Sequence, residues 1–137
     1  MVASGPTILY VEDSLKSRRL SGSVLRDCGF EVFTTADPVE AIQKFGRLRF
    51  HAALIEYRMA LTPGPDLAVK MKTLYPDVPV VMLSGCTVLP DRELLYVDAH
   101  FGSGTSLHDL LFTLLTLACS GAAQRTRATA ANWADST

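Results

Sequence analysis

A short apolar run that ends in an acid constrains the fold of this chain more than any other stretch. Residues Ala52–Ile55 are small or apolar, and Glu56 follows them directly. A run of this length between polar residues indicates a strand buried on both faces, as in the middle of a parallel sheet. In open α/β sheets, ligands bind beyond the carboxyl ends of the strands. We therefore expect Glu56 to face a cleft instead of the core.

Four further segments have the pattern of strands, and helical patterns separate them. The strand candidates are residues 7–11, 30–35, 80–83 and 99–101. Helices are expected from Ser14 to Gly29, from Asp37-Pro38 onward, over 66–74, over 91–97 as a short and weak helix, and from 107 onward. The inner faces of the first, second and last helices are predicted to carry Leu15, Leu20, Val24 and Leu25; Val39, Ile42 and Phe45; and Leu107, Leu110, Leu111, Leu114, Leu115 and Ala118. This alternation predicts an α/β fold, a doubly wound five-stranded parallel sheet with helices on both faces.

Length and composition favour one domain, and they give no sign of a nucleic-acid or membrane partner. The chain has 137 residues and a formal net charge of −1. Cys28, Cys86 and Cys119 lack the spacing of metal ligands, which favours reduced thiols in a cytoplasmic protein. No charged segment followed by an apolar one stands at the start, and the longest apolar stretch is too short for a bilayer, so we expect neither a signal sequence nor a membrane span. We predict a domain over residues 1–119 and a flexible tail over 120–137.

Polar side chains follow three of the predicted strands at distinctive spacings. Glu12 and Asp13 follow the first strand, Glu56 follows the third, and Ser84 follows the fourth. With these residues in place, the chain resembles the receiver domain of two-component response regulators from Ile8 to about Leu117. The resemblance implies a flavodoxin-like fold with the strand order 2-1-3-4-5.

The resemblance also implies a role for each matching residue. In that family an acid pair after the first strand binds Mg²⁺, and an aspartate after the third accepts a phosphoryl group from a histidine kinase. Glu12 and Asp13 match the acid pair, and with Glu56 they are the expected Mg²⁺ ligands. Glu56 falls on the phosphoacceptor position, Ser84 on a hydroxyl that bonds the phosphoryl group, and Phe101 on an aromatic residue that rotates with the switch.

Two departures from the family pattern argue against conventional phosphorylation. Glu56 is longer than Asp by one methylene, and a misplacement of about 1 Å can cost roughly 100-fold in rate. No lysine follows Lys72, so the family's fifth-strand lysine, which would pair with the phosphoryl group, is missing. Three carboxylates without that lysine require a divalent cation, a raised pKa on one acid, or a nearby arginine such as Arg58.

We therefore expect a stand-alone pseudo-receiver, a module of a phosphorelay-type system that is not an enzyme and acts through protein contacts. Its partner would be a histidine kinase or a downstream signalling protein, and it would bind neither nucleic acid directly nor a membrane. Glu56 could hold an active-like state by reaching toward Ser84, or it could be a tolerated substitution, and the sequence leaves both open.

The sequence also leaves other functions open. A receiver with residual phosphorylation or Mg²⁺ binding is one alternative. Another is a small-ligand or anion site at the loop Gly102–Ser106, whose small residues expose backbone N–H groups, although Ser106 or Thr105 capping the last helix is favoured. No Ser-His-Asp arrangement is evident, because packing or solvation explains His51, His100 and His108, and Cys86 is taken as a spectator thiol. Phe112 lies off the core stripe and, with Leu117, favours a homodimer through the face of the fourth and fifth helices.

Overall fold

The computed structural model describes residues 5–47, 50–85, 89–102 and 106–119. Within these ranges, five parallel strands form one sheet in the order β2-β1-β3-β4-β5. The strands are β1 (Thr7–Val11), β2 (Glu31–Thr35), β3 (Ala52–Glu56), β4 (Val80–Leu83) and β5 (Ala99–Phe101). The helical segments are α1 (Leu15–Asp27), α2 (Pro38–Arg47), α3 (Gly64–Leu74), the 3-10 turn η1 (Asp91–Glu93) and a helix over residues 107–119. The predicted sheet and its strand order are confirmed.

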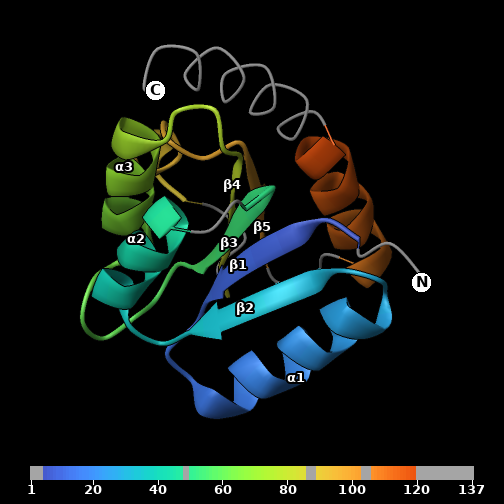
Figure 1. Cartoon of the computed structure of the whole chain (residues 1–137). Coiled ribbons are helices and arrows are strands. Elements are labelled where there is room, and N and C mark those ends of the chain that lie inside the picture. The colour runs from blue at the N-terminus through green and yellow to red at the C-terminus, as the bar shows by residue number, and fades with distance from the viewer. Residues whose placement is uncertain (1–4, 48–49, 86–88, 103–105, 120–137) are drawn as a thin grey trace, which may run out of the picture.

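Helices cover both faces of this sheet. α2 and α3 lie on one face, and α1 and the helix over residues 107–119 lie on the other (Figure 1). Successive side chains of a strand point to opposite faces. In β1, Leu9 and Val11 therefore join the core under α2 and α3, whereas Ile8 and Tyr10 join the core under α1 and the last helix.

The central strand β3 is buried on both faces, as predicted. All four residues of the run Ala52–Ile55 are 0% exposed. Burial of an aliphatic side chain such as Leu54 or Ile55 contributes about 1.5–3 kcal/mol. Because Glu56 is the last residue of β3, the packing of this strand fixes its position at the carboxyl-terminal end of the sheet.

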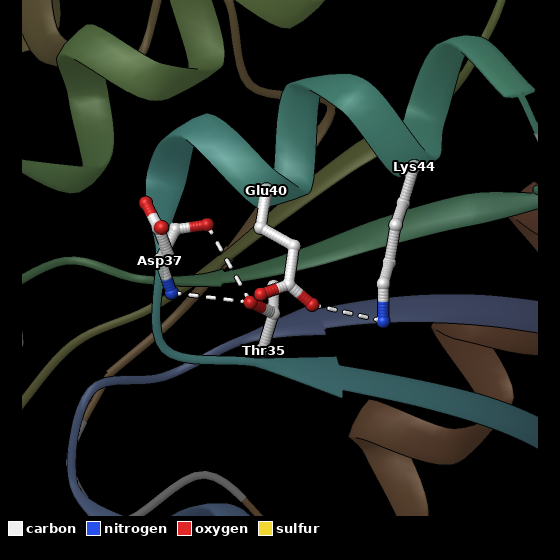
Figure 2. Close-up of polar contacts among 4 residues, drawn as sticks. All are labelled: Thr35, Asp37, Glu40 and Lys44. Atoms are coloured by element: carbon white, nitrogen blue, oxygen red, sulfur yellow. Dashed lines mark hydrogen bonds and ion pairs between the residues drawn. The ribbon is translucent and has the colours of Figure 1, made fainter.

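The ends of α1 and α2 follow from local hydrogen bonds. Ser14 Oγ accepts the N–H of Ser17 at 3.4 Å and begins α1, and Gly29, with φ of +101°, follows its end. Figure 2 shows the start of α2, where Thr35 Oγ1 accepts the N–H of Asp37 at 3.1 Å. It also shows the i,i+4 ion pair on the surface of α2, between Lys44 Nζ and Glu40 Oε1 at 3.0 Å.

The inner faces of the helices agree with the prediction only in part. Leu25, Leu114 and Ala118 are buried as predicted. Leu15, Leu20 and Val39 are more than half exposed, and Leu107 and Leu115 are nearly half exposed. Small residues lie against the sheet instead, Gly22 in α1 and Ala41 in α2. A Cβ at Gly22 would lie 3.3 Å from Thr34 Cγ2, so this glycine lets α1 approach β2 closely. Val24 and Ile42 are partly buried, and the side chain of Phe45 lies outside the described residues.

The predicted fourth helix is also wrong. Residues 91–97 form the three-residue turn η1, followed by a second turn in which Val97 N–H donates to Leu94 O at 3.2 Å. The apolar residues of this stretch do not form one buried stripe, because Leu95 and Tyr96 are exposed while Leu94 and Val97 pack on the core. Helix α3 begins at Gly64, before the predicted start at Asp66.

Two further sequence predictions concern the ends and the environment of the chain. The predicted tail over residues 120–137 lies outside the described residues, so it stays a prediction. Among the described helices, none is long and apolar enough to cross a membrane.

Candidate functional site

The structure brings the predicted site residues to the carboxyl edge of the sheet. Glu12 and Asp13 follow β1, Glu56 is the last residue of β3, Ser84 follows β4, and Phe101 ends β5. Parallel strands end at the same edge, so residues far apart in the sequence meet there. Glu12 and Ser84 are buried, whereas Asp13 is exposed.

The carboxyls of Glu12 and Glu56 are hydrogen-bonded to each other. Two carboxyls can form such a bond only if one of them is protonated, because an ionised carboxylate only accepts. Burial, the bond to Glu12 and the charges of Glu12 and Asp13 raise the pKa of Glu56 from 4.5 to about 7. A hydrogen bond from the backbone of Arg58 acts in the opposite direction and lowers the pKa of Glu56. The protonated form of Glu56 is therefore favoured more than in an ordinary glutamate.

Backbone N–H groups donate to one oxygen of Asp13 and to one oxygen of Glu12. Asp13 Oδ2 accepts the N–H of Ala60 at 2.8 Å, across 47 positions of sequence. Glu12 Oε1 accepts the N–H of Ser14 at 3.1 Å. These bonds join the end of β1 to the loop after β3 and to the start of α1.

Two basic residues lie at the site in ways that the sequence did not predict. Arg58 was expected to reach the cleft if the strand continued, but β3 ends at Glu56 and Arg58 contributes its backbone. Arg18, which the sequence reasoning missed, donates from Nη1 to the backbone O of Glu12 at 2.8 Å. Its position one turn into α1, whose start adjoins Glu12, was the available signal.

Tyr10 is a second residue that the sequence reasoning missed. It is 1% exposed, and it lies in the core beneath α1. Burial and the charges of Glu12 and Glu56 raise the pKa of Tyr10 to about 12, while a hydrogen bond with Ser21 lowers it. The phenol therefore stays neutral at physiological pH.

Gly64 is required by the way the loop after β3 folds back. Its N–H donates to Tyr57 O at 2.9 Å. A Cβ at Gly64 would collide with Glu56 O and would lie 2.9 Å from Met82 Sδ. Met59, in the same loop, is buried in the core under α2 and α3.

Ser84 and Phe101 are neighbours in the sheet. The N–H of Ser84 donates to Phe101 O at 3.0 Å, and Phe101 packs on the core under α1. In the loop Gly102–Ser106, residues 103–105 lie outside the described residues. Ser106 Oγ accepts the N–H of Asp109 at 3.1 Å, so the predicted cap of the last helix is confirmed for Ser106.

The last lysine of the chain lies away from this site. Lys72 Nζ pairs with Asp98 Oδ2 at 2.7 Å, and the same oxygen accepts the N–H of Val80 at 2.7 Å. Val80 is the first residue of β4, so this ion pair lies at the amino-terminal end of the strands, whereas Glu56 lies at their carboxyl-terminal end.

The acid site shows how carboxylates can be satisfied without a metal. Carboxylate oxygens are suitable ligands for Mg²⁺. However, Glu12 and Glu56 bind each other, and Asp13 binds a backbone N–H. Over the part of the chain that the structure describes, no group of three or more His, Cys, Asp or Glu side chains could hold a metal ion. The predicted ligand set of Glu12, Asp13 and Glu56 stays a prediction.

Comparison with known proteins establishes the family. Residues 8–99, more than half of the chain, match the model of the response regulator receiver domain. The chain belongs to the response regulator receiver family. It is 30% identical over 89 residues to the transcriptional regulatory protein PrrA of Mycobacterium leprae (strain TN), a match that covers 65% of this chain and 38% of that protein. This receiver domain thus spans well under half the length of that relative.

A second curated relative is a larger enzyme. The receiver domain is 35% identical over 80 residues to protein-glutamate methylesterase/protein-glutamine glutaminase 1 of Anaeromyxobacter dehalogenans (strain 2CP-C). That match covers 58% of this chain and 23% of the enzyme. The likeness therefore concerns a minor part of the enzyme's length.

Solved structures have the same fold. The chemotaxis response regulator CheY4 of Vibrio cholerae has a TM-score of 0.72 and 26% identity, and the match covers 83% of this chain and 99% of that chain. The receiver domain of a sensor histidine kinase from Pseudomonas aeruginosa PAO1, with a magnesium ion in its active-site cleft, has a TM-score of 0.76 and 24% identity. This match covers 85% of this chain and 100% of that chain.

Proposed function

We propose that this receiver domain acts through protein contacts in two-component-type signalling, without being switched by conventional aspartyl phosphorylation. The observation that carries the proposal is the place of Glu56 at the end of β3, beside Glu12 and Asp13, where the family has an aspartate. A phosphoacceptor must attack as an ionised carboxylate, and the raised pKa of Glu56 disfavours that form. The absence of lysine after Lys72 removes the charge that would stabilise the product.

The proposed partner is a histidine kinase or a downstream signalling protein, and the proposed location of this protein is the cytoplasm. We propose no catalytic activity for the chain itself, and no direct contact with nucleic acid or a membrane. The formal net charge of −1 supports this choice, because proteins that bind such polyanionic surfaces usually present an excess of basic residues.

The test is exposure of the protein to acetyl phosphate, and separately to beryllofluoride, each with Mg²⁺. Intact mass would detect an adduct, and amide NMR shifts near Glu56 and Ser84 would detect the phosphoryl analogue. We expect neither in the natural chain. The matched variant Glu56→Asp restores the family's residue while the lysine stays absent, so a response in it alone would show that the extra methylene silences the site. An adduct on Glu56 of the natural chain would refute the proposal.

The effect of Glu56 on signalling needs a separate experiment. The bonds of its carboxyl to Glu12 and to the backbone of Arg58 support a site satisfied by its own groups. Partner binding would be compared for the natural chain, Glu56→Ala and Glu56→Asp. Equal binding by all three would reject the idea that Glu56 imitates an activated state.

A second candidate function is Mg²⁺ binding by Glu12, Asp13 and Glu56. The magnesium ion in the Pseudomonas aeruginosa relative supports it. So does the place of the three acids after β1 and at the end of β3, although the described side chains do not form a cation site as they stand. A bound ion would supply the positive charge that the missing lysine does not. Calorimetric titration with Mg²⁺ tests this, with Asp13→Asn as the weakened variant. Equal heats for the two proteins would reject the ligand set.

A further inference from the structure

The residue after Glu56 is held firmly by its backbone. The N–H of Tyr57 donates to Leu83 O at 2.7 Å, and Tyr57 O accepts the N–H of Gly64 at 2.9 Å. These bonds join Tyr57 to the end of β4 and to the first residue of α3. Tyr57 must therefore follow any displacement of the end of β3, where Glu56 lies.

The side chain of Tyr57 reaches the stretch between β4 and β5. Its hydroxyl donates to Glu93 Oε2 at 2.6 Å, across 36 positions of sequence. Hydrogen bonds to an ionised carboxylate are roughly twice as strong as neutral ones. The ring also packs at the margin of the core under α2 and α3, as Leu94 and Val97 do.

The stretch of residues 90–97 has few other regular contacts. Its backbone forms short turns, in which Glu93 N–H donates to Pro90 O and Leu94 N–H donates to Asp91 O, each at 3.0 Å. Leu95 is 74% exposed and Tyr96 is 44% exposed. A segment with these features opens at low free-energy cost, so one strong side-chain bond has a large effect on its order.

Tyr57 also lines two hollows of the protein surface. It lines a groove of about 380 Å³ between α3 and η1, together with Pro63, Asp66, Arg92 and Tyr96. It lines a second hollow with Arg58 and Ala60 of the loop after β3. The shape of both surfaces therefore depends on where the Tyr57 ring is held.

We propose that Tyr57 is a positioning residue that couples the Glu56 site to the surface of residues 90–97 through its bond to Glu93. A displacement at the end of β3 moves the Tyr57 hydroxyl, which shifts or releases Glu93 and changes the groove beside η1. The inference goes beyond the proposed function, and it applies whether or not Glu56 accepts a phosphoryl group. The bond between Tyr57 and Glu93 holds residues 90–97 in either case.

The first experiment measures hydrogen exchange of the amides of residues 91–97. Tyr57→Phe removes the hydroxyl and keeps the ring, and we expect exchange in this stretch to rise about tenfold, with the central strands unchanged. Glu93→Gln keeps an accepting oxygen but loses the charge, so its effect should be smaller. Tyr96→Phe, which removes a hydroxyl from the other wall of the groove, is the matched control. Unchanged exchange in Tyr57→Phe, or an equal rise in every strand, would overturn the inference.

The second experiment measures the coupling itself. Glu56→Gln is introduced into the natural chain and into Tyr57→Phe, and the amide NMR shifts of residues 91–97 are compared. We expect the shifts caused by Glu56→Gln to fall to less than half when the Tyr57 hydroxyl is absent. Equal shifts in both backgrounds, or none in either, would reject the coupling and leave the proposed function intact. An acetyl phosphate adduct on Glu56 with the coupling preserved would instead reject the proposed function alone.

Discussion

Replacement of Glu56 by Gln should stabilise the fold at pH 8 and leave it unchanged at pH 4. The amide of Gln is neutral at every pH, and its N–H can donate to the Glu12 carboxylate as the protonated Glu56 does. In the natural chain, the pKa of Glu56 is raised from 4.5 to about 7 by burial and by its neighbouring acids. The folded state therefore prefers the neutral form of this residue.

The sign and size of the effect follow from that preference. Below pH 4.5 Glu56 is protonated in both the folded and the unfolded state, so its carboxyl adds no penalty. Between pH 4.5 and 7 the unfolded state loses the proton while the folded state keeps it, and stability falls. The full shift corresponds to about 3 kcal/mol. Solvent screening of a partly exposed group reduces this loss to about 1–2 kcal/mol, which Glu56→Gln should recover.

Urea and thermal unfolding at pH 4, 6 and 8 would measure the difference between the two proteins. At pH 8 we expect Tm to rise by roughly 3–8 °C in Glu56→Gln. Glu40→Gln is the matched control. It removes the surface i,i+4 ion pair with Lys44, and this loss should lower the free energy of unfolding by no more than about 0.5 kcal/mol. A difference between Glu56→Gln and the natural chain that stays constant from pH 4 to pH 8 would refute the reasoning.

Three further predictions test packing and the outer surface. Gly64→Ala should lower the free energy of unfolding by about 2 kcal/mol or more, because the added Cβ would collide with backbone. Gly85→Ala is the control and should change it little, because no atom lies within 4 Å of its added Cβ. Equal urea midpoints for the two variants would contradict this prediction. Leu114→Ala should cost about 2–5 kcal/mol, since Leu114 is fully buried, and a loss below about 1 kcal/mol in urea would contradict it. Phe112→Asp should leave the fold intact, because Phe112 is exposed, and it should dissociate a dimer in light scattering; a monomeric natural chain would reject that dimer.

Most of the fold could be predicted because each strand carries its own signal. The runs that become β1, β4 and β5 have the predicted bounds, and β2 differs only in beginning at Glu31 instead of Phe30. The helices were less predictable in detail. Apolar spacing suggests a buried stripe, but the stripe that meets the sheet is narrow and uses small residues such as Gly22 and Ala41, which leaves Leu20 and Val39 exposed. Residues 91–97 lacked a continuous stripe, and they form turns.

The site residues also divide into those that the sequence predicts and those that only the structure reveals. The positions of Glu12, Asp13, Glu56 and Ser84 at one edge follow from their places after parallel strands. The raised pKa of one acid was among the predicted outcomes, but Glu12 was not identified as a residue that contributes to it. Arg18 and Tyr10 were missed because their contribution depends on how α1 lies against β1.

The sequence by itself determined the parallel sheet, the carboxylates at its carboxyl edge and the lack of a lysine after Lys72, because these depend on local patterns and on composition. Only the tertiary structure decided that Glu56 bonds to Glu12, that Asp13 takes the N–H of Ala60, and that Tyr57 reaches Glu93. Each of these bonds joins segments at least 36 positions apart. Their formation depends on where separately folded elements are packed, and no local pattern of residues encodes that distance.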